Sequence, residues 1–191
     1  IYQNPDLQRT VQIHKKYQSP YFSPLLKEFA LNYTPATEDL TQYPVYYAVI
    51  YADMLANALQ PLIDWKLQKG FQVITEPISA IGNNTTNIKN YIEGLYNGPN
   101  PPTFVLLVGD IEQIVSYTGQ TGGHVSDLYY TTMTTGDFVP DIYIGRLSAQ
   151  SEPQLTAQIN KILFHEKYQF PQTTFLNHGT FSATDYGGNY T

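Results

Sequence analysis

Acidic residues in the second half of the chain have the types and spacing to bind a hard cation. Asp137, Val139 and Asp141 alternate, so extended backbone would turn two carboxylates and one carbonyl toward the same side. Asp110 directly follows an apolar run, and sites in parallel sheets form beyond the carboxyl ends of strands. Three carboxylates without nitrogen or sulfur ligands suit calcium. The spacing therefore predicts a calcium site, while Asp110 taken alone would fit a local cap of the following turn better than a metal ligand.

The sequence offers no nucleophile with an activating partner. It contains no cysteine, which excludes disulfides, thiolate zinc sites and a cysteine nucleophile within these residues. Neither a Gly-x-Ser-x-Gly elbow nor a Gly-x-Gly-x-x-Gly turn is present. The histidines lack metal-site spacing, and structural or surface roles are expected for most of them: His14, His124, His165 and His178. These residues therefore predict no complete catalytic centre.

Composition narrows the class of partner. The 191 residues carry 10 Lys+Arg against 16 Asp+Glu, a formal net charge of -6, and the longest basic cluster is Lys15-Lys16. This balance argues against a nucleic-acid partner and against an anionic membrane surface, since both need many basic contacts. No run of 18 apolar residues exists, so no membrane span is expected. Low charge and 17 tyrosines are typical of secreted bacterial proteins.

Strand and helix patterns alternate after a boundary near Pro44. Short apolar runs predict strands at 46–51, 71–75, 103–108 and 141–145, and the run at 103–108 is the most apolar, which places it at the sheet centre. Helical spacing follows Asp53, which could cap its helix, and also the Asn83-Asn84 pair and Ser151. Residues 111–141 predict loops and a β-hairpin around 128–132. The expected fold is a three-layer α/β sandwich, a mostly parallel sheet with helices on both faces.

An ordered series of short motifs resembles the gingipain family of secreted cysteine endopeptidases. The motifs extend over about residues 46 to 168, in the family's order: DWK at 64–66, KGF at 69–71, IKNYI at 88–92, FVLLVGD at 104–110, SD at 126–127 and DIYIGRLS at 141–148. The resemblance implies a caspase-like α/β catalytic domain made of two subdomains. Residues 1–44 would then end an N-terminal prodomain or linker, residues 45–170 would form the first subdomain, and residues 171–191 would begin a truncated second one.

The same resemblance implies which functional residues are present. In the family, the catalytic Cys and a His in a Gly-His-Gly context belong to the second subdomain, and the sequence around His178 reads Asn-His-Gly instead. No catalytic residue is therefore expected here. A structural calcium ion would be bound by the side chains of Asp110, Asp137 and Asp141 and by the carbonyls of Thr134 and Val139. Asp141 is shorter than the family's acid, so it would reach less far or bind through a water.

Two functions of different classes follow. The chain is expected to be the N-terminal part of a secreted or cell-surface bacterial cysteine endopeptidase, a calcium-stabilised scaffold without the Cys/His dyad. Its full-length parent would act on protein or peptide substrates, and a second catalytic subdomain would dock on it. The alternative is a non-catalytic gingipain-like module for calcium-dependent binding or protein secretion. A Gly-His-Gly and a later Cys beyond Thr191 would distinguish the peptidase. A flavodoxin-like cofactor binder is disfavoured because no phosphate-binding loop is present.

Overall fold

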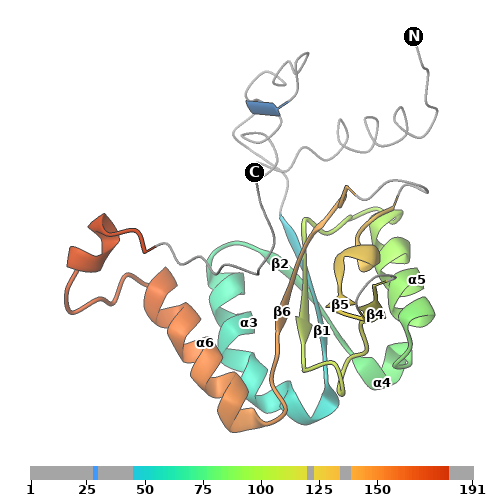
Figure 1. The fold of residues 1–191 in the computed structure, drawn as a ribbon, viewed down its shortest axis with the longest axis horizontal. Coiled ribbons are helices and arrows are strands. Elements are labelled where there is room, and N and C mark those ends of the chain that lie inside the picture. Colours follow the sequence, from blue (N-terminus) through green and yellow to red (C-terminus); the bar gives the residue numbers. More distant parts are fainter. Residues whose placement is uncertain (1–27, 30–44, 120–122, 134–138, 181–191) are drawn as a thin grey trace, which may run out of the picture.

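A four-stranded parallel sheet forms the centre of the computed structural model, which describes residues 28–29, 45–119, 123–133 and 139–180. The strands lie in the order β2-β1-β3-β6 (Figure 1). Their bounds are Tyr46–Tyr51 for β1, Gln72–Pro77 for β2, Phe104–Val108 for β3 and Tyr143–Leu147 for β6. The most apolar run, β3, is an inner strand of this order, as predicted. Every one of its residues after Phe104 is buried, as expected for an inner strand of a parallel sheet.

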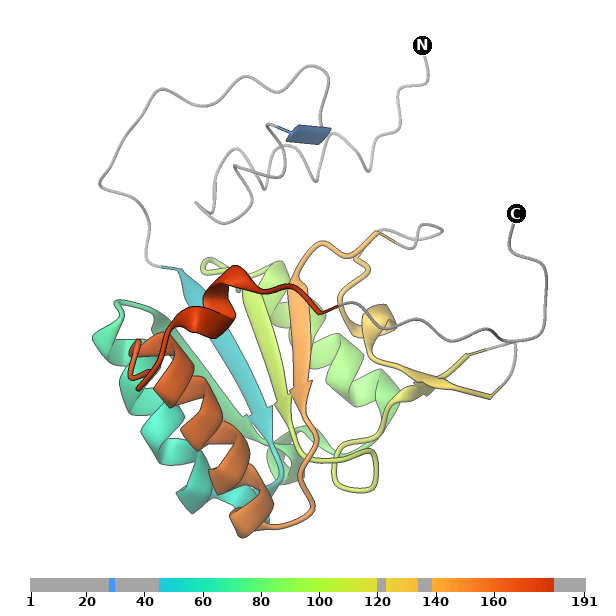
Figure 2. The ribbon, with the colours of Figure 1, turned by 60° about the vertical axis from the view of Figure 1, so that its left-hand side comes forward.

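Helices cover both faces of this sheet, which confirms the predicted α/β sandwich (Figures 1 and 2). One face carries η1 (Asp53–Leu55), α3 (Ala56–Gln68) and α6 (Glu152–Glu166), and the other carries α4 (Ile78–Ile81), α5 (Thr85–Tyr96) and η2 (Leu128–Tyr130). After α6, the short helix η3 (Thr174–Asn177) ends the elements that the structure describes. None of the described helices is long and apolar enough to cross a membrane.

The face under α3 and α6 is held by aliphatic side chains at helical spacing. Leu55, Leu59 and Leu62 are at most 2% exposed, and they meet Leu155 and Ile159 of α6 over the sheet. Burying one such side chain stabilises the fold by about 1.5–3 kcal/mol. This half of the core therefore fixes α6 against α3.

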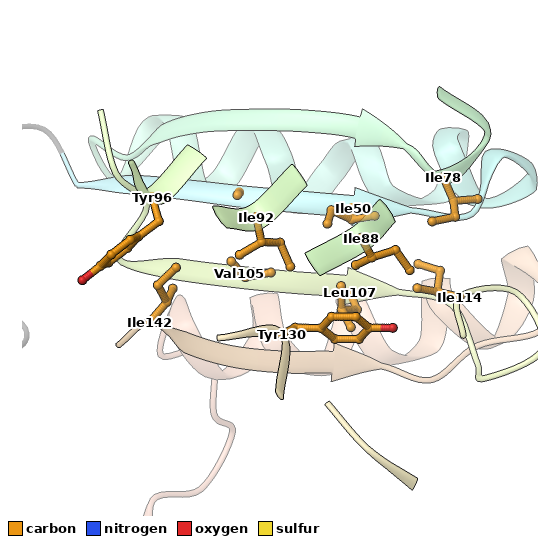
Figure 3. Packing of buried hydrophobic residues seen from close by; sticks show 11 residues of the cluster. Ile50, Ile78, Ile88, Ile92, Tyr96, Val105, Leu107, Ile114, Tyr130 and Ile142 are labelled. Carbon is orange, nitrogen blue, oxygen red and sulfur yellow. The ribbon is translucent and has the colours of Figure 1, made fainter. Parts of the chain in front are cut away.

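The opposite face is held by α5 and by the buried side chain of Tyr130 from η2 (Figure 3). Asn84 accepts a hydrogen bond from the backbone of Asn87 and starts α5, as the sequence predicted. From there Ile88 and Ile92 point into the sheet and are fully buried. Tyr130 is also fully buried, and its hydroxyl donates to the carbonyl of Val115 at 2.6 Å. Burial raises the pKa of Tyr130, so it stays a neutral donor.

The hairpin predicted around 128–132 is wrong. Residues 128–130 form the 3-10 turn η2, and the hairpin instead pairs β4 (Tyr117–Thr118) with β5 (Val125–Ser126) in antiparallel fashion. The turn forms because the side chain of Tyr130 is buried under α5, while the hydroxyl and backbone N–H of Thr131 both donate to the carbonyl of Leu128.

Two further local predictions also need correction. The strand predicted at 141–145 begins at Tyr143, because the backbone N–H of Asp141 donates to the carbonyl of Thr131 and ties Asp141 to the turn before the sheet. Asp53 does not cap the first helix; its carboxylate accepts hydrogen bonds from the backbone and the hydroxyl of Ser79. The division at residues 44 and 170 stays a prediction, and residues 1–27 and 181–191 lie outside the described part.

Candidate functional site at the carboxyl edge of the sheet

Polar side chains gather where the parallel strands end. Asp53 follows β1, Ser79 follows β2 and Asp110 follows β3. Ser148 and Gln150 follow β6. Because the order β2-β1-β3-β6 reverses direction between β1 and β3, the carboxyl edge also contains the switch point at which open α/β sheets bind ligands. This edge is therefore where the fold would place a ligand or reacting groups.

Asp110 is engaged on both carboxylate oxygens. Its Oδ1 accepts from the hydroxyl of Ser148 at 2.6 Å and from the backbone of Ile111 at 2.9 Å, and its Oδ2 accepts from Nε2 of Gln150 at 2.7 Å. The hydrogen bond from Ser148, followed by those from Ile111 and Gln150, lowers the pKa of Asp110 below its usual value. The backbone bends sharply before it, since Gly109 has φ +147°. Asp110 thus ties the end of β3 to the exit of β6.

Arg146 is the best-buried charged group at this edge. Its Nε and Nη2 donate to the two carboxylate oxygens of Asp127, each at 2.8 Å, and its Nη1 donates to the carbonyls of Gly109 and Ile114, each at 2.9 Å. The side chain of Arg146 is 12% exposed and that of Asp127 is 20% exposed. Ser116 adds a further hydrogen bond to Asp127 at 2.8 Å. This fork, the Arg146–Asp127 clamp, joins β6, the loop after β3 and the segment before η2.

These contacts hold structure and do not prepare a nucleophile. In each Ser–Asp pair the hydroxyl donates to a carboxylate: Ser79 to Asp53, Ser148 to Asp110 and Ser116 to Asp127. A general base needs a pKa near the working pH, whereas hydrogen bonds lower the pKa of both Asp53 and Asp110. Such carboxylates bind protons too weakly to activate a hydroxyl. No catalytic residue was predicted in this chain, and that stays a prediction.

The described histidines take no part in the hydrogen bonds of the carboxyl edge given above. The ring of His165, in the last turn of α6, packs edge-on against Phe170 at 5.1 Å between centroids. His124 and His178 are exposed, and His14 lies outside the described residues. All three described histidines are exposed, which agrees with the prediction of structural or surface roles.

The predicted calcium ligands do not converge. Asp110 lies two residues beyond the carboxyl end of β3, whereas Asp141 lies two residues before β6 begins. The parallel register pairs Phe104 with Tyr143 and Val108 with Leu147, so these two aspartates are at opposite edges of the sheet. With a rise of about 3.3 Å per residue, they are separated by more than the length of a strand and cannot bind one ion. The spacing of these acids in the sequence did not show that Asp110 follows β3 whereas Asp141 precedes β6.

Of the other predicted ligands the structure describes Val139, which is 69% exposed, whereas Thr134 and Asp137 lie outside the described residues. Oδ2 of Asp141 accepts from the backbone of Met133 at 2.7 Å. Within the ranges that the structure describes, no three His, Cys, Asp or Glu side chains are grouped as a metal site would require. Because two of the five predicted ligands lie outside the described residues, the calcium site stays a prediction, except that the sheet register separates Asp110 from Asp141.

A second charged cluster lies at the opposite end of the sheet, between α3 and α6. Glu166 accepts from Nζ of Lys66 at 2.6 Å, from Nζ of Lys69 at 2.9 Å and from the indole of Trp65 at 2.8 Å. Burial opposes ionisation, but the hydrogen bonds from these three donors outweigh it and lower the pKa of Glu166 to about 2. Lys66 also lies 5.5 Å from the ring centroid of Tyr47.

No role was predicted from the sequence for Arg146, Asp127 or Glu166. A signal was available for Arg146, because an arginine inside an apolar strand must find a partner. Glu166 gave no such signal, because its partners are about 100 positions away in the chain.

Comparisons with known proteins agree with the motifs. The family model described as peptidase family C25 matches residues 40–191. Lys-gingipain of Porphyromonas gingivalis is 33% identical over 183 residues, which is 92% of this chain and 10% of that protein. Gingipain R2 of the same organism is 27% identical over 175 residues, 90% of this chain and 23% of that protein. The chain thus spans less than a quarter of either relative.

Solved structures share the fold. The structure of a protease is 34% identical and superposes with a TM-score of 0.65, over 73% of this chain and 32% of that one. The crystal structure of the Arg-specific cysteine proteinase gingipain R is 28% identical, with a TM-score of 0.58, over 69% of this chain and 30% of that one. The α/β sandwich described above therefore matches about a third of each of these solved chains.

Proposed function

Because this chain belongs to peptidase family C25, we propose that it is the first subdomain of a gingipain-like cysteine endopeptidase whose nucleophile and base follow residue 191 in a longer parent. One observation carries the proposal. The family match runs over residues 40–191, yet these 191 residues contain no cysteine. The thiolate that a cysteine peptidase requires must then come from another part of the protein.

In this proposal, the hydrogen bonds at the carboxyl edge hold the strand ends of the chain rigid. The Arg146–Asp127 clamp fixes the loop after β3 relative to β6, and Asp110 fixes the exit of β6 through Ser148. Rigid strand ends provide a stable base for a catalytic subdomain, whose reacting groups must be held to within a fraction of an ångström. The chain would support hydrolysis of protein or peptide substrates without touching the scissile bond.

Secretion or cell-surface exposure of a bacterial parent is also part of the proposal. It is supported by the low content of charged residues, 14%, together with 17 tyrosines. Treatment of intact producing cells with an added protease tests it. The parent is expected in the culture medium or among surface proteins that the added protease removes, and recovery only from lysed cells would contradict this location.

Calcium remains a proposal in a reduced form. The candidate ligands are the predicted ones without Asp110: Asp137, Val139 and Asp141, which the sequence spacing grouped, and Thr134, which the family resemblance added. Calcium is expected to raise the melting temperature of the chain, and the increase should disappear in Asp137→Ala. Asp110→Ala is the matched control, because its carboxylate lies at the other edge of the sheet and should leave the calcium response intact. The same melting temperature in excess calcium and in excess chelator would contradict the proposal.

The peptidase proposal is tested by comparing the 191-residue chain with its longer parent on a mixed peptide library. The chain alone should not cleave, and the parent should cleave in a way that iodoacetamide abolishes. A parent without a Gly-His-Gly and a later Cys, and without thiol-dependent cleavage, would instead support the non-catalytic binding or secretion module. Thiol-dependent cleavage by the isolated chain would contradict the proposal outright.

A further inference from the structure

Two large apolar side chains are exposed at the carboxyl edge and take no part in the contacts described above. Met54 of η1 is 55% exposed, and Ile111 in the loop after β3 is 44% exposed. They belong to the segments that leave β1 and β3, the neighbouring strands between which the strand order reverses direction. A single exposed apolar residue needs no explanation, but these two border the position at which open α/β sheets bind ligands.

The exits of β1 and β3, toward which the strand arrows of Figure 1 point, are held together. The backbone N–H of Ala52 donates to the carbonyl of Val108 at 2.9 Å, so the two segments stay hydrogen-bonded where they leave the sheet. At Gly109 an added Cβ would lie 3.0 Å from Cβ of Gln113 and 3.4 Å from Cβ of Ala52. A glycine therefore lets the loop after β3 approach the exit of β1 closely. The two exposed side chains thus start from a fixed base.

The loop after β3 also holds a buried acceptor without a donor. Oε1 of Gln113 is buried, and it has no hydrogen-bond partner among the residues that the structure describes. The backbone of Gln113 is fixed on both sides, because its carbonyl accepts from Nδ2 of Asn83 at 3.1 Å and its N–H donates to the carbonyl of Asp110 at 3.0 Å. An unsatisfied buried acceptor costs free energy, which a donor group bound at this edge would recover. The orphan oxygen thus favours a ligand with N–H groups over an entirely apolar one.

The charges at this edge favour a basic ligand. No lysine or arginine occurs in the four segments that follow the strands: 52–55, 78–84, 109–116 and 148–152. Their acids are Asp53, Asp110, Glu112 and Glu152, of which Asp110 is partly exposed and the others are exposed. Hydrogen bonds from serine hydroxyls lower the pKa of Asp53 and Asp110, so both stay ionised at neutral pH. The resulting negative potential repels phosphate groups, which disfavours a nucleotide, and attracts lysine and arginine side chains.

We infer that Asp53, Met54, Ile111 and Glu112 form an accessory binding site for a segment of a protein substrate that carries apolar and basic side chains. The inference rests on the proposed function and names the kind of substrate segment that this chain would hold, apart from the scissile bond. Met54 and Ile111 would contact the apolar side chains, and the thioether of Met54 adapts to apolar groups of different shape. A second copy of the chain is a poorer occupant, because it would bring the same acidic surface and a net charge of -6.

Peptide binding to the 191-residue chain tests the inference without hydrolysis. The probe is a short fluorescein-labelled peptide of alternating leucine and lysine, and two matched probes replace the lysines by glutamate or the leucines by serine. Fluorescence anisotropy should show an affinity for the leucine–lysine peptide that is at least about tenfold higher than for either matched peptide. Equal affinity for the three peptides would overturn the inference.

Substitutions at the accessory site should lower this affinity. Met54→Ser and Ile111→Ser should each weaken binding of the leucine–lysine peptide by about three- to tenfold, because each removes an apolar contact. Glu112→Gln should weaken it by about twofold at low salt and by less at high salt. Leu67→Ser is the matched control and should leave the affinity unchanged, since Leu67 is 49% exposed in the last turn of α3, at the opposite end of the sheet. Wild-type affinity in both Met54→Ser and Ile111→Ser would contradict the site.

Cleavage by the longer parent gives a second readout. With unfolded casein as the substrate, Met54→Ser should raise KM by about three- to tenfold and leave kcat unchanged, because a contact remote from the scissile bond is made equally in the ground and transition states. With a tripeptide substrate, which is too short to reach the accessory site, both constants should stay unchanged. An equal rise in KM on both substrates would overturn the inference.

The two readouts separate this inference from the proposed function. A parent that cleaves casein with unchanged constants in Met54→Ser would refute only the accessory site. A parent that never cleaves, although the chain binds the leucine–lysine peptide through Met54, would refute only the proposed function. Self-association of the chain that Met54→Ser abolishes would overturn the inference in favour of a second copy.

Discussion

Replacing Glu166 by Gln should weaken the attachment of α6 to α3. The change keeps the shape of the side chain and removes its charge. Lys66 is only 11% exposed, so it would be left as a cation beside a neutral amide. The gap between the pKa of about 2 and the ordinary value of 4.5 corresponds to about 3.4 kcal/mol. Glu166 stays 26% exposed and solvent screens its ion pairs, so we discount this to about 2 kcal/mol at neutral pH.

Urea unfolding at a series of pH values measures this effect and its sign. A lowered pKa stabilises the fold above the unfolded value near 4.5, and this contribution is lost as the pH falls from about 4.5 toward 2. The difference in unfolding free energy between wild type and Glu166→Gln should therefore be constant near neutrality and shrink in acid. At neutral pH the melting temperature should fall by about 4–8 °C.

A matched control uses Glu112→Gln, which removes one charge from an exposed side chain of the loop after β3. It should change the unfolding free energy by less than about 0.5 kcal/mol. The reasoning fails if Glu166→Gln costs no more than this control, or if its cost is the same at pH 3 as at pH 7.

The remaining predictions concern Arg146 and Gly109 at the carboxyl edge and Tyr130 in the core packed against α5. Each is measured by urea unfolding at neutral pH. Arg146→Met should cost about 3–5 kcal/mol, because it leaves the carboxylate of Asp127 largely buried without its partner; a cost below 1 kcal/mol would mean that the clamp is dispensable. Tyr130→Phe should cost about 1 kcal/mol by removing one buried hydrogen bond, and an unchanged midpoint would contradict that bond. Gly109→Ala should cost about 1–3 kcal/mol, since φ is +147° and the new Cβ would lie 3.0 Å from Cβ of Gln113; a stability gain would show that the turn is unstrained.

The sandwich could be predicted because its signals are local. Short apolar runs marked the strands, and helical spacing marked α3, α5 and α6. Boundaries failed where a tertiary contact overrides local preference. Asp141 is tied to Thr131 and Met133 and so falls outside β6, and the burial of Tyr130 turns a predicted hairpin into η2.

The site was harder to predict, because function here depends on which end of a strand a residue occupies. Asp110 and Asp141 look equivalent as acids next to apolar runs, yet one follows its strand and the other precedes its strand. Spacing in the sequence cannot distinguish these cases without the register. The Glu166 cluster was missed for a similar reason, since its ion pairs join α3 and α6 across about 100 residues.

The central claim is that this chain is the scaffold of a cysteine peptidase whose nucleophile lies elsewhere in the parent. Alkylation of the active parent with iodoacetamide, followed by peptide mapping, tests it most directly. Loss of peptide cleavage should track the modification of one cysteine located after Thr191. Cleavage that persists when every cysteine of the parent has been alkylated would contradict it.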